Sequence, residues 1–227
     1  MCGRFTLTWQ DRDSLSRELG VPLGQIPESD YRPRYNVAPT NKHWIMRMEH
    51  EDRELLRARW GLINHWAKDP KAAYRQINAR AETLDERPAF RDAFKNRRCV
   101  VPADGFFEWS GPKGTRQPIW FRRHDGGLIL FAGLYESWQV APGEWEPTFT
   151  IVTTRANATL EPVHDRMPVI LPDALVDEWL YPRQDNLEAL AGLLVPPPDD
   201  LLTATPVSPR VNSIKNDDPA CLEPVSP

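Results

Sequence analysis

The sequence predicts a single β-rich domain of the α+β class. Short apolar runs of β type recur along most of the 227 residues, and turn residues separate them. Only a few stretches have helical spacing. No repeat or low-complexity linker divides the chain, so we expect one domain over residues 1–227, with the proline-rich segment from about 195 packed on the core or trailing it.

The first third of the chain predicts a strand, a helix and a long loop region. Arg4–Thr8 has a strand signal, and a helix signal follows in which Leu15 and Leu19 lie four residues apart. Gly20 is the expected stop of this helix. Residues 20–43 are rich in proline and polar groups and predict ordered loops.

The middle of the chain predicts a hairpin and then mixed structure. His43–Met48 and Leu55–Leu62 are expected strands around the charged turn Glu49–Glu54. After another loop come the segment Tyr74–Ala79 and a short helix near Ala89–Lys95.

From Cys99 onward β-type runs dominate, at Cys99–Val101, Phe106–Ser110, Ile119–Arg122, Leu128–Leu134 and Thr148–Thr154. Turn residues separate them at Gly111-Pro112, Asp125-Gly126-Gly127 and Pro142-Gly143.

Two helices are expected near the C-terminal end. Pro172–Leu180 has proline at its opening position, and Asn186–Leu194 has Asp185 as its expected cap. The tail Val195–Pro227 is rich in proline.

Composition and charge narrow the classes of function. The net charge is −4, which excludes a protein that coats nucleic acid through its overall charge but leaves room for a local basic groove. Nine tryptophans are many for this length. Some are expected in the core and others could stack on unpaired bases, and composition does not separate the two roles.

The chain carries the features of a cytoplasmic protein. It has no apolar stretch of membrane-spanning length and no signal peptide, so no membrane partner is expected. The three cysteines, Cys2, Cys99 and Cys221, are scattered, which disfavours a disulfide framework. No C-x-x-C pair is present, so neither a metal nor another cofactor is predicted.

Cys2 is notable for its position directly after Met1. Removal of Met1 would leave an α-amine and a thiol on one residue, with ordinary pKa values of about 7.7–8.0 and 8.5. Such an aminothiol reacts with an aldehyde to give a Schiff base and then a thiazolidine. The alternative is a second residue that merely happens to be cysteine, and Cys2 taken alone favours this alternative.

Three further residues could carry chemistry, each with an alternative. Glu108 lies in an apolar strand-like run, so it either faces solvent or is buried with a raised pKa suited to proton transfer. His164 stands beside Asp165 between two prolines, either at the surface or in a site. Asn78 could hold a sugar or phosphate with Arg80, or could cap the next helix.

Together these residues belong to a longer series of segments. The series is Met1-Cys2-Gly3-Arg4-Phe5, Tyr35-Asn36-Val37-Ala38-Pro39-Thr40, Arg59-Trp60-Gly61-Leu62, Ile77-Asn78-Ala79-Arg80-Ala81-Glu82-Thr83, Val101 to Trp109, Ala132-Gly133-Leu134-Tyr135, Val163-His164-Asp165-Arg166-Met167-Pro168 and Val211-Asn212-Ser213. This series resembles the SRAP family, the SOS response-associated peptidases, whose members crosslink to abasic sites. The matches run in order over nearly the whole chain.

The resemblance implies a fold, a partner and four catalytic residues. The fold is a twisted, barrel-like antiparallel β core with peripheral helices, and the partner is single-stranded DNA that contains abasic sites. Cys2 is implied as the crosslinking nucleophile and Asn78 as a holder of the opened sugar or the Cys2 backbone. Glu108 is implied as the acid and base of ring opening, Schiff-base formation and reversal. His164 is implied to assist proton transfer, which also fits a lyase side reaction by β-elimination.

The resemblance also implies a set of DNA contacts. Those to phosphate are Arg4, Arg80 and Arg166, with Thr153 as a further candidate, and those to bases are Trp66 and Trp109, with Pro39 nearby. We expect the protein to act as a monomer, in the cytoplasm and at the nucleoid during DNA damage.

The sequence departs from the family pattern at two places. Asn64-His65 stands before Trp66 where proline is common, and Phe107 replaces a common tyrosine next to Glu108. Both changes bear on details of DNA contact rather than on the four catalytic residues.

Two rival functions remain at this stage. One is a peptidase or autopeptidase with an N-terminal nucleophile, as the family name suggests. The other is a DNA-binding module that holds single strands reversibly and does not need Cys2. A thiol redox protein is disfavoured because no second cysteine is close to Cys2 in the sequence.

Overall fold

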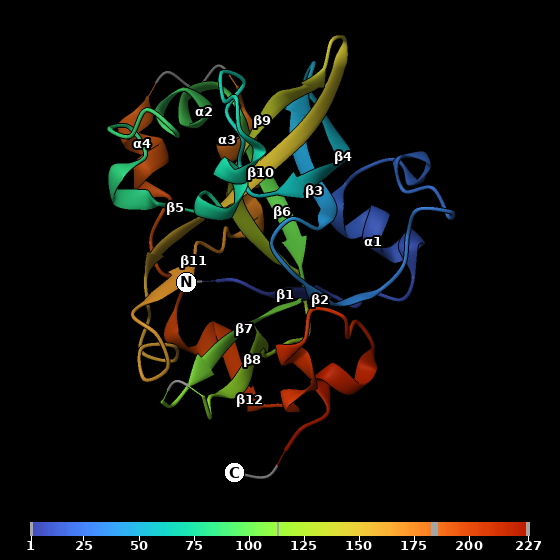
Figure 1. The fold of residues 1–227 in the computed structure, drawn as a ribbon, viewed down its shortest axis with the longest axis vertical. Coiled ribbons are helices and arrows are strands. Elements are labelled where there is room, and N and C mark those ends of the chain that lie inside the picture. Colours follow the sequence, from blue (N-terminus) through green and yellow to red (C-terminus); the bar gives the residue numbers. More distant parts are fainter. Residues whose placement is uncertain (1, 113, 183–185, 226–227) are drawn as a thin grey trace.

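The computed structural model describes residues 2–112, 114–182 and 186–225, and its centre is a closed β-barrel (Figure 1). Five strands form the barrel in the order β10-β4-β3-β6-β9. The barrel is closed because the last strand, β9, also pairs with the first strand, β10. Their bounds are β3 Lys42–Glu49, β4 Asp52–Trp60, β6 Arg98–Ala103, β9 Ile129–Ala141 and β10 Glu144–Arg155. Short strands β5, Asn78–Arg80, and β11, Arg166–Pro168, extend the sheet along β10.

A second sheet of five strands lies against the barrel. Its order is β12-β8-β7-β1-β2. The bounds are β1 Phe5–Leu7, β2 Arg34–Val37, β7 Gly105–Ser110, β8 Gln117–Arg123 and β12 Leu202–Pro206. In Figure 1 this sheet and the C-terminal segment occupy the lower part of the molecule, below β11.

Aromatic side chains join the two sheets into one core. The ring of Phe5 in β1 lies 4.7 Å from that of His43 and 5.0 Å from that of Trp60, centroid to centroid. Phe106 in β7 packs on Phe131 of β9 at 5.9 Å. These rings are fully or almost fully buried, and burial of such large apolar areas is the main stabilising contribution to this junction.

The described residues form four short α-helices, which lie outside the barrel. Their bounds are α1 Arg12–Leu19, α2 Arg91–Asn96, α3 Val176–Leu180 and α4 Leu187–Gly192. Figure 1 shows α2, α3 and α4 at one side of the barrel and α1 at the other. None of the helices in the described ranges has the length and apolar character needed to cross a membrane.

The prediction of a β-rich α+β fold with a barrel-like core is confirmed, with one difference of direction. β10 runs parallel to β4 and β5, so the core is not wholly antiparallel. The predicted hairpin and the stop of α1 are also confirmed. Gly20 follows α1 in the left-handed conformation at φ 64°, which glycine adopts without steric cost.

Two strands form where the sequence predicts loop or tail. β2 lies inside the region 20–43, and β12 lies inside the proline-rich tail, where it pairs with β8 over five residues. β9 and β10 are also longer than expected, and Gly143 at φ 83° closes their hairpin. These strands are defined by backbone pairing with a partner rather than by their own apolar pattern.

The two late helices differ from prediction at their starts. Pro172 precedes a 3₁₀ turn, Asp173–Leu175, and the α-helical part begins only at Val176. The expected cap Asp185 lies outside the described residues. The Asn186 side chain caps α4 by accepting from the backbone N–H of Ala189.

Candidate functional site

Cys2 lies just before β1 and is held by the neighbouring strand β7. Phe5 pairs with Phe106, and the Arg4 carbonyl accepts from the Phe107 N–H at 3.0 Å. This antiparallel pairing carries the chain start along β7 toward Glu108. The Cys2 thiol is fully buried. Burial, and next the negative charge of Glu108, raise the pKa of this thiol, so it is held protonated and needs a base to become a nucleophile.

Glu108 is buried on β7, with 4% of its surface exposed. Of the two alternatives for this residue, the solvent-facing one is therefore wrong. Burial raises the pKa of the carboxyl, and the charges that oppose this effect include that of His164. Glu108 thus lies in the field of both Cys2 and His164, and a raised pKa makes its carboxyl a better candidate for proton transfer than an ordinary glutamate.

His164 lies in the loop before β11 with 29% of its side chain exposed. Its Nδ1 accepts from the backbone N–H of Arg166 at 2.9 Å. Because that N–H can only donate, this contact assigns the proton of the neutral ring to Nε2. The Asp165 carboxylate lies 3.0 Å from the same Nδ1, and its side chain is 88% exposed.

Asn78 begins β5 and pairs with Ile151 of β10. Both atoms of its side-chain amide are buried and have no hydrogen-bond partner among the described residues. Buried amides are nearly always bonded, so this one is suited to a ligand that brings both a donor and an acceptor. The helix-cap alternative is wrong, because the next turn begins after Arg80 and no side chain caps it.

Strand β10 brings Arg80 and Arg166 to the same part of the sheet. Thr153 of β10 pairs with Arg80 on one side and with Pro168 of β11 on the other. Arg80 is exposed, whereas Arg166 forks onto the Glu82 carboxylate at 2.5 and 2.9 Å. Thr153 is fully buried, and its carbonyl accepts from Arg166 at 2.6 Å. Thr153 therefore positions Arg166, while its own phosphate contact stays a prediction.

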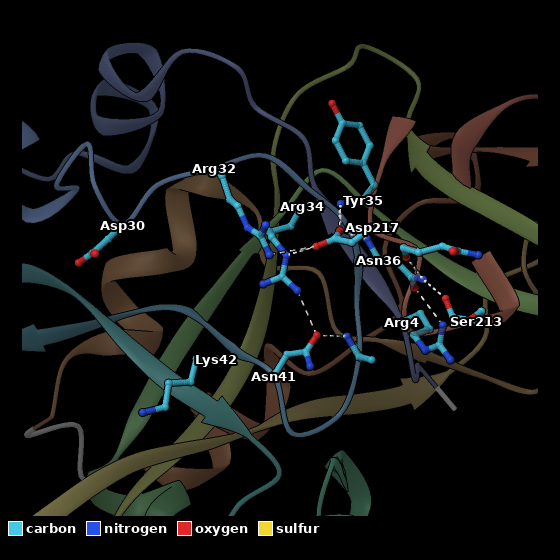
Figure 2. A network of polar contacts seen from close by, with 12 residues as sticks. Arg4, Asp30, Arg32, Arg34, Tyr35, Asn36, Asn41, Lys42, Ser213 and Asp217 are labelled. Atoms are coloured by element: carbon cyan, nitrogen blue, oxygen red, sulfur yellow. Dashed lines mark hydrogen bonds and ion pairs between the residues drawn. The ribbon is translucent and has the colours of Figure 1, made fainter. Parts of the chain in front are cut away.

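Arg4 and Trp109 are held by the C-terminal segment. The Arg4 guanidinium donates to Asn36 Oδ1 at 2.9 Å (Figure 2). The same guanidinium donates to the Val211 carbonyl at 2.7 Å. It also lies over the Trp109 ring, 5.8 Å from the centroid. Trp109 in turn donates to Asn212 at 2.7 Å. The only sequence signal for this enclosure is the match at Val211-Asn212-Ser213.

The two remaining DNA candidates lie on loops. Pro39 is half-buried in the turn after β2, and Trp66 is 59% exposed in the loop after β4. The Asn64 side chain, in place of proline, donates to the Ala89 carbonyl at 2.8 Å and fixes that loop. Phe107 is fully buried against the C-terminal segment, on the strand face opposite to Glu108.

The fold and site define a class of β-rich protein in which a buried cysteine before β1 lies in the field of a buried glutamate on β7, and that glutamate in the field of a histidine. A family model described as SOS response associated peptidase (SRAP) matches residues 1–214. The chain belongs to the SRAP family.

Named relatives and a solved structure are similar over almost the whole chain. It is 43% identical over 225 residues to abasic site processing protein YoqW of Bacillus subtilis, with 98% of this chain and 99% of YoqW covered. It is 31% identical over 255 residues to abasic site processing protein HMCES of Xenopus tropicalis, with 97% and 70% covered. A crystal structure of a protein from Bacteroides thetaiotaomicron aligns with a TM-score of 0.85 and 26% identity, over 99% of this chain and 100% of that one.

Proposed function

We propose that this protein recognises abasic sites in single-stranded DNA and bonds covalently to them through Cys2 after removal of Met1. The observation that carries the proposal is the burial of the Cys2 thiol in the electrostatic field of Glu108. The charge of His164 acts in turn on the Glu108 carboxyl. The names of the similar proteins, abasic site processing proteins, support the choice of substrate. We infer that the protein acts as a monomer.

The reaction uses the ring-opened aldehyde of the abasic sugar. The α-amine of Cys2 attacks the aldehyde carbon, and loss of one water gives a Schiff base. The thiol sulfur then adds to the imine carbon, and the thiol proton passes to the nitrogen, which closes a thiazolidine. The net change is one C–N bond and one C–S bond formed and one water released.

Each side chain has a defined task in this sequence. Glu108, with its raised pKa, moves protons between the sugar oxygen, the amine and the thiol. Asn78 offers its unbonded amide to the opened sugar. His164 presents Nε2 toward a sugar hydroxyl or phosphate, a position from which it could also assist β-elimination and give a lyase side reaction. The same groups would run the crosslink in reverse.

Binding before the reaction would rest on Arg4, Arg80 and Arg166 at phosphates and on Trp66 and Trp109 at bases. Each stacked base contributes about 1–3 kcal/mol. We infer that the protein acts in the cytoplasm on damaged DNA at the nucleoid. Any peptidase activity is inferred to be limited to the removal of Met1 or a short N-terminal piece.

Denaturing electrophoresis with intact mass analysis tests the proposal. The protein is mixed with a single-stranded oligonucleotide that carries one abasic site, and with the same oligonucleotide without it. We expect a heat-stable band only with the abasic strand, at the summed mass of the Met1-free protein and the DNA less one water.

Cys2→Ala is the matched control, since it keeps the α-amine and removes only the sulfur. We expect it to bind DNA weakly and to lose the stable adduct entirely. No adduct from a chain shown by mass to begin at Cys2 would overturn the proposal. Hydrolysis of peptides would then favour the peptidase, and unchanged reversible binding would favour the non-covalent module.

A further inference from the structure

A second concave site lies at the far end of β1 from Cys2. It is a cavity of about 250 Å³ between the loop 29–34 and strands β2, β3 and β4. Four cationic side chains line it, Arg32, Arg34, Lys42 and Arg57, against the single carboxylate of Asp30. None of these residues belongs to the site around Cys2.

The carboxylates nearby do not balance these cations. Asp217 lies 2.5 Å from Arg34 and 3.7 Å from Arg32, so one carboxylate serves two guanidinium groups (Figure 2). Glu146 is likewise shared, at 3.1 Å from Lys42 and 3.6 Å from Arg59. With Asp30, three carboxylates face five cations in a chain whose net charge is −4.

Arg57 is the cation with the weakest compensation. Its guanidinium donates to the backbone carbonyls of Asp30 at 3.1 Å and Lys42 at 3.5 Å. Its Nε is buried and has no hydrogen-bond partner among the described residues. The group also stacks over Trp44, 5.1 Å from the ring centroid, which holds its plane in place.

The concentration of positive charge lowers the pKa values of basic groups around the cavity. Burial, followed by the charge of Arg34, lowers the pKa of Arg57. Burial lowers the pKa of His43 to about 3, and the charges of Arg34 and Arg57 add to this effect. An anion in the cavity would relieve this repulsion, and a guanidinium fork matches phosphate oxygens well.

A polar network connects this cavity to the candidate DNA surface. The Asn41 side-chain oxygen accepts from Arg34 at 3.1 Å and from the Ala38 N–H at 3.1 Å, directly before Pro39 (Figure 2). Leu7 lines the cavity, and the five residue-to-residue steps from Cys2 to Leu7 span about 16 Å of extended chain. A DNA strand bound at Cys2 can therefore reach the cavity with nucleotides that lie only a few positions from the one at Cys2.

We propose that the cavity lined by Arg32, Arg34 and Arg57 binds a phosphate group of the DNA strand, beyond the nucleotides held at Cys2. Asp217 and Asn41 orient Arg34. Arg32 and Arg57 have N–H groups that can donate hydrogen bonds to the ligand. The inference rests on the proposed function, because it assigns the cavity to the same strand.

Reversible binding of intact oligonucleotides of increasing length tests this assignment. The probe strands carry no abasic site and range from about five to about fifteen nucleotides, the size range of single-strand sites. The variant is Arg32→Gln with Arg57→Gln, and Arg34 is left in place because Asp217 depends on it. For the longer strands we expect roughly tenfold weaker binding and a salt slope that falls by about 0.7 for the lost phosphate.

A control of equal charge is Arg17→Gln with Arg122→Gln, two exposed residues that do not line the cavity. An equal loss of affinity in both double variants, or an equal loss at every strand length, would overturn the inference. Inorganic phosphate is the probe for binding of a free ion. If it binds in the cavity of the wild type while strand length has no effect on DNA affinity, the ligand is free phosphate and not DNA. Arg57→Lys tests folding, since it keeps the charge and should recover part of the affinity.

The outcome is separable from that of the proposed function. Crosslinking of the wild type to an abasic strand is measured in the same series and does not depend on strand length beyond the nucleotides at Cys2. Loss of crosslinking in the wild type would reject the proposed function. Length-independent binding with normal crosslinking would reject only the phosphate cavity.

Discussion

Two glutamates of this protein are equally buried but have different electrostatic surroundings. Glu136 on β9 and Glu108 on β7 are exposed by only 3% and 4%. Glu136 meets Arg97 at 2.6 Å and His65 at 3.7 Å, so a permanent cation compensates its charge. Glu108 lies in the field of a thiol and a histidine, and burial raises its pKa. Equal burial therefore gives an ion pair with Arg97 in one place and a carboxyl with a raised pKa, the proposed proton-transfer group, in the other.

The largest expected effect comes from Glu108→Gln. The amide fills the same space but cannot take up or release a proton, so the crosslinking rate should fall by about 10²–10⁴-fold. Single-turnover time courses with an abasic strand measure it. A rate within threefold of wild type would mean that Glu108 is a packing residue and that another group moves the protons.

The same variant sharpens the comparison through its pH dependence. A carboxyl whose pKa is raised in the folded protein binds more protons folded than unfolded, so its contribution to stability falls as pH rises above its ordinary value of 4.5. Relative to Glu108→Gln, the wild type should lose stability between that pH and the raised folded pKa. Urea unfolding at several pH values measures the difference. A wild type that gains stability over the variant as pH rises would show that the carboxylate is well compensated.

Glu136→Gln should lower the stability of the protein and leave the crosslinking rate almost unchanged. It leaves Arg97 without its carboxylate, and since Arg97 is 28% exposed we expect a loss of about 1–3 kcal/mol rather than the larger cost of a fully buried pair. Urea unfolding at neutral pH gives this value. The crosslinking rate below the unfolding transition should stay within about threefold of wild type, because Glu136 contacts none of the four candidate catalytic residues in the described contacts. A Glu136→Gln variant that is stable but does not crosslink would show that Glu136 takes part in the reaction rather than in stability.

Asp165→Asn should have the smallest effect. The carboxylate lies 3.0 Å from His164 Nδ1, but its side chain is 88% exposed and solvent screens its charge. We expect a change of at most about twofold in the crosslinking rate. A loss above tenfold would identify Asp165 as the group that orients His164.

Local sequence signals predict those parts of the fold in which a short segment carries its own pattern. The β3–β4 hairpin has strand-forming runs on both sides of a charged turn, and Gly20 ends α1 because glycine adopts that conformation freely. β2 and β12 have no such pattern. Their strand geometry comes from β1 and β8, which lie far from them in the sequence.

The sequence by itself determined which residue types are available and in what order: a cysteine at the second position, a glutamate in an apolar strand, and the series of segments that identifies the family. Only the tertiary structure decided that Glu108 is buried, that the buried Asn78 amide has no hydrogen-bond partner in the described part of the chain, and that residues 211–217 enclose Arg4 and orient Arg34. The reason is physical. Burial, pKa and hydrogen-bond satisfaction depend on groups brought together from distant parts of the chain, and no local pattern encodes them.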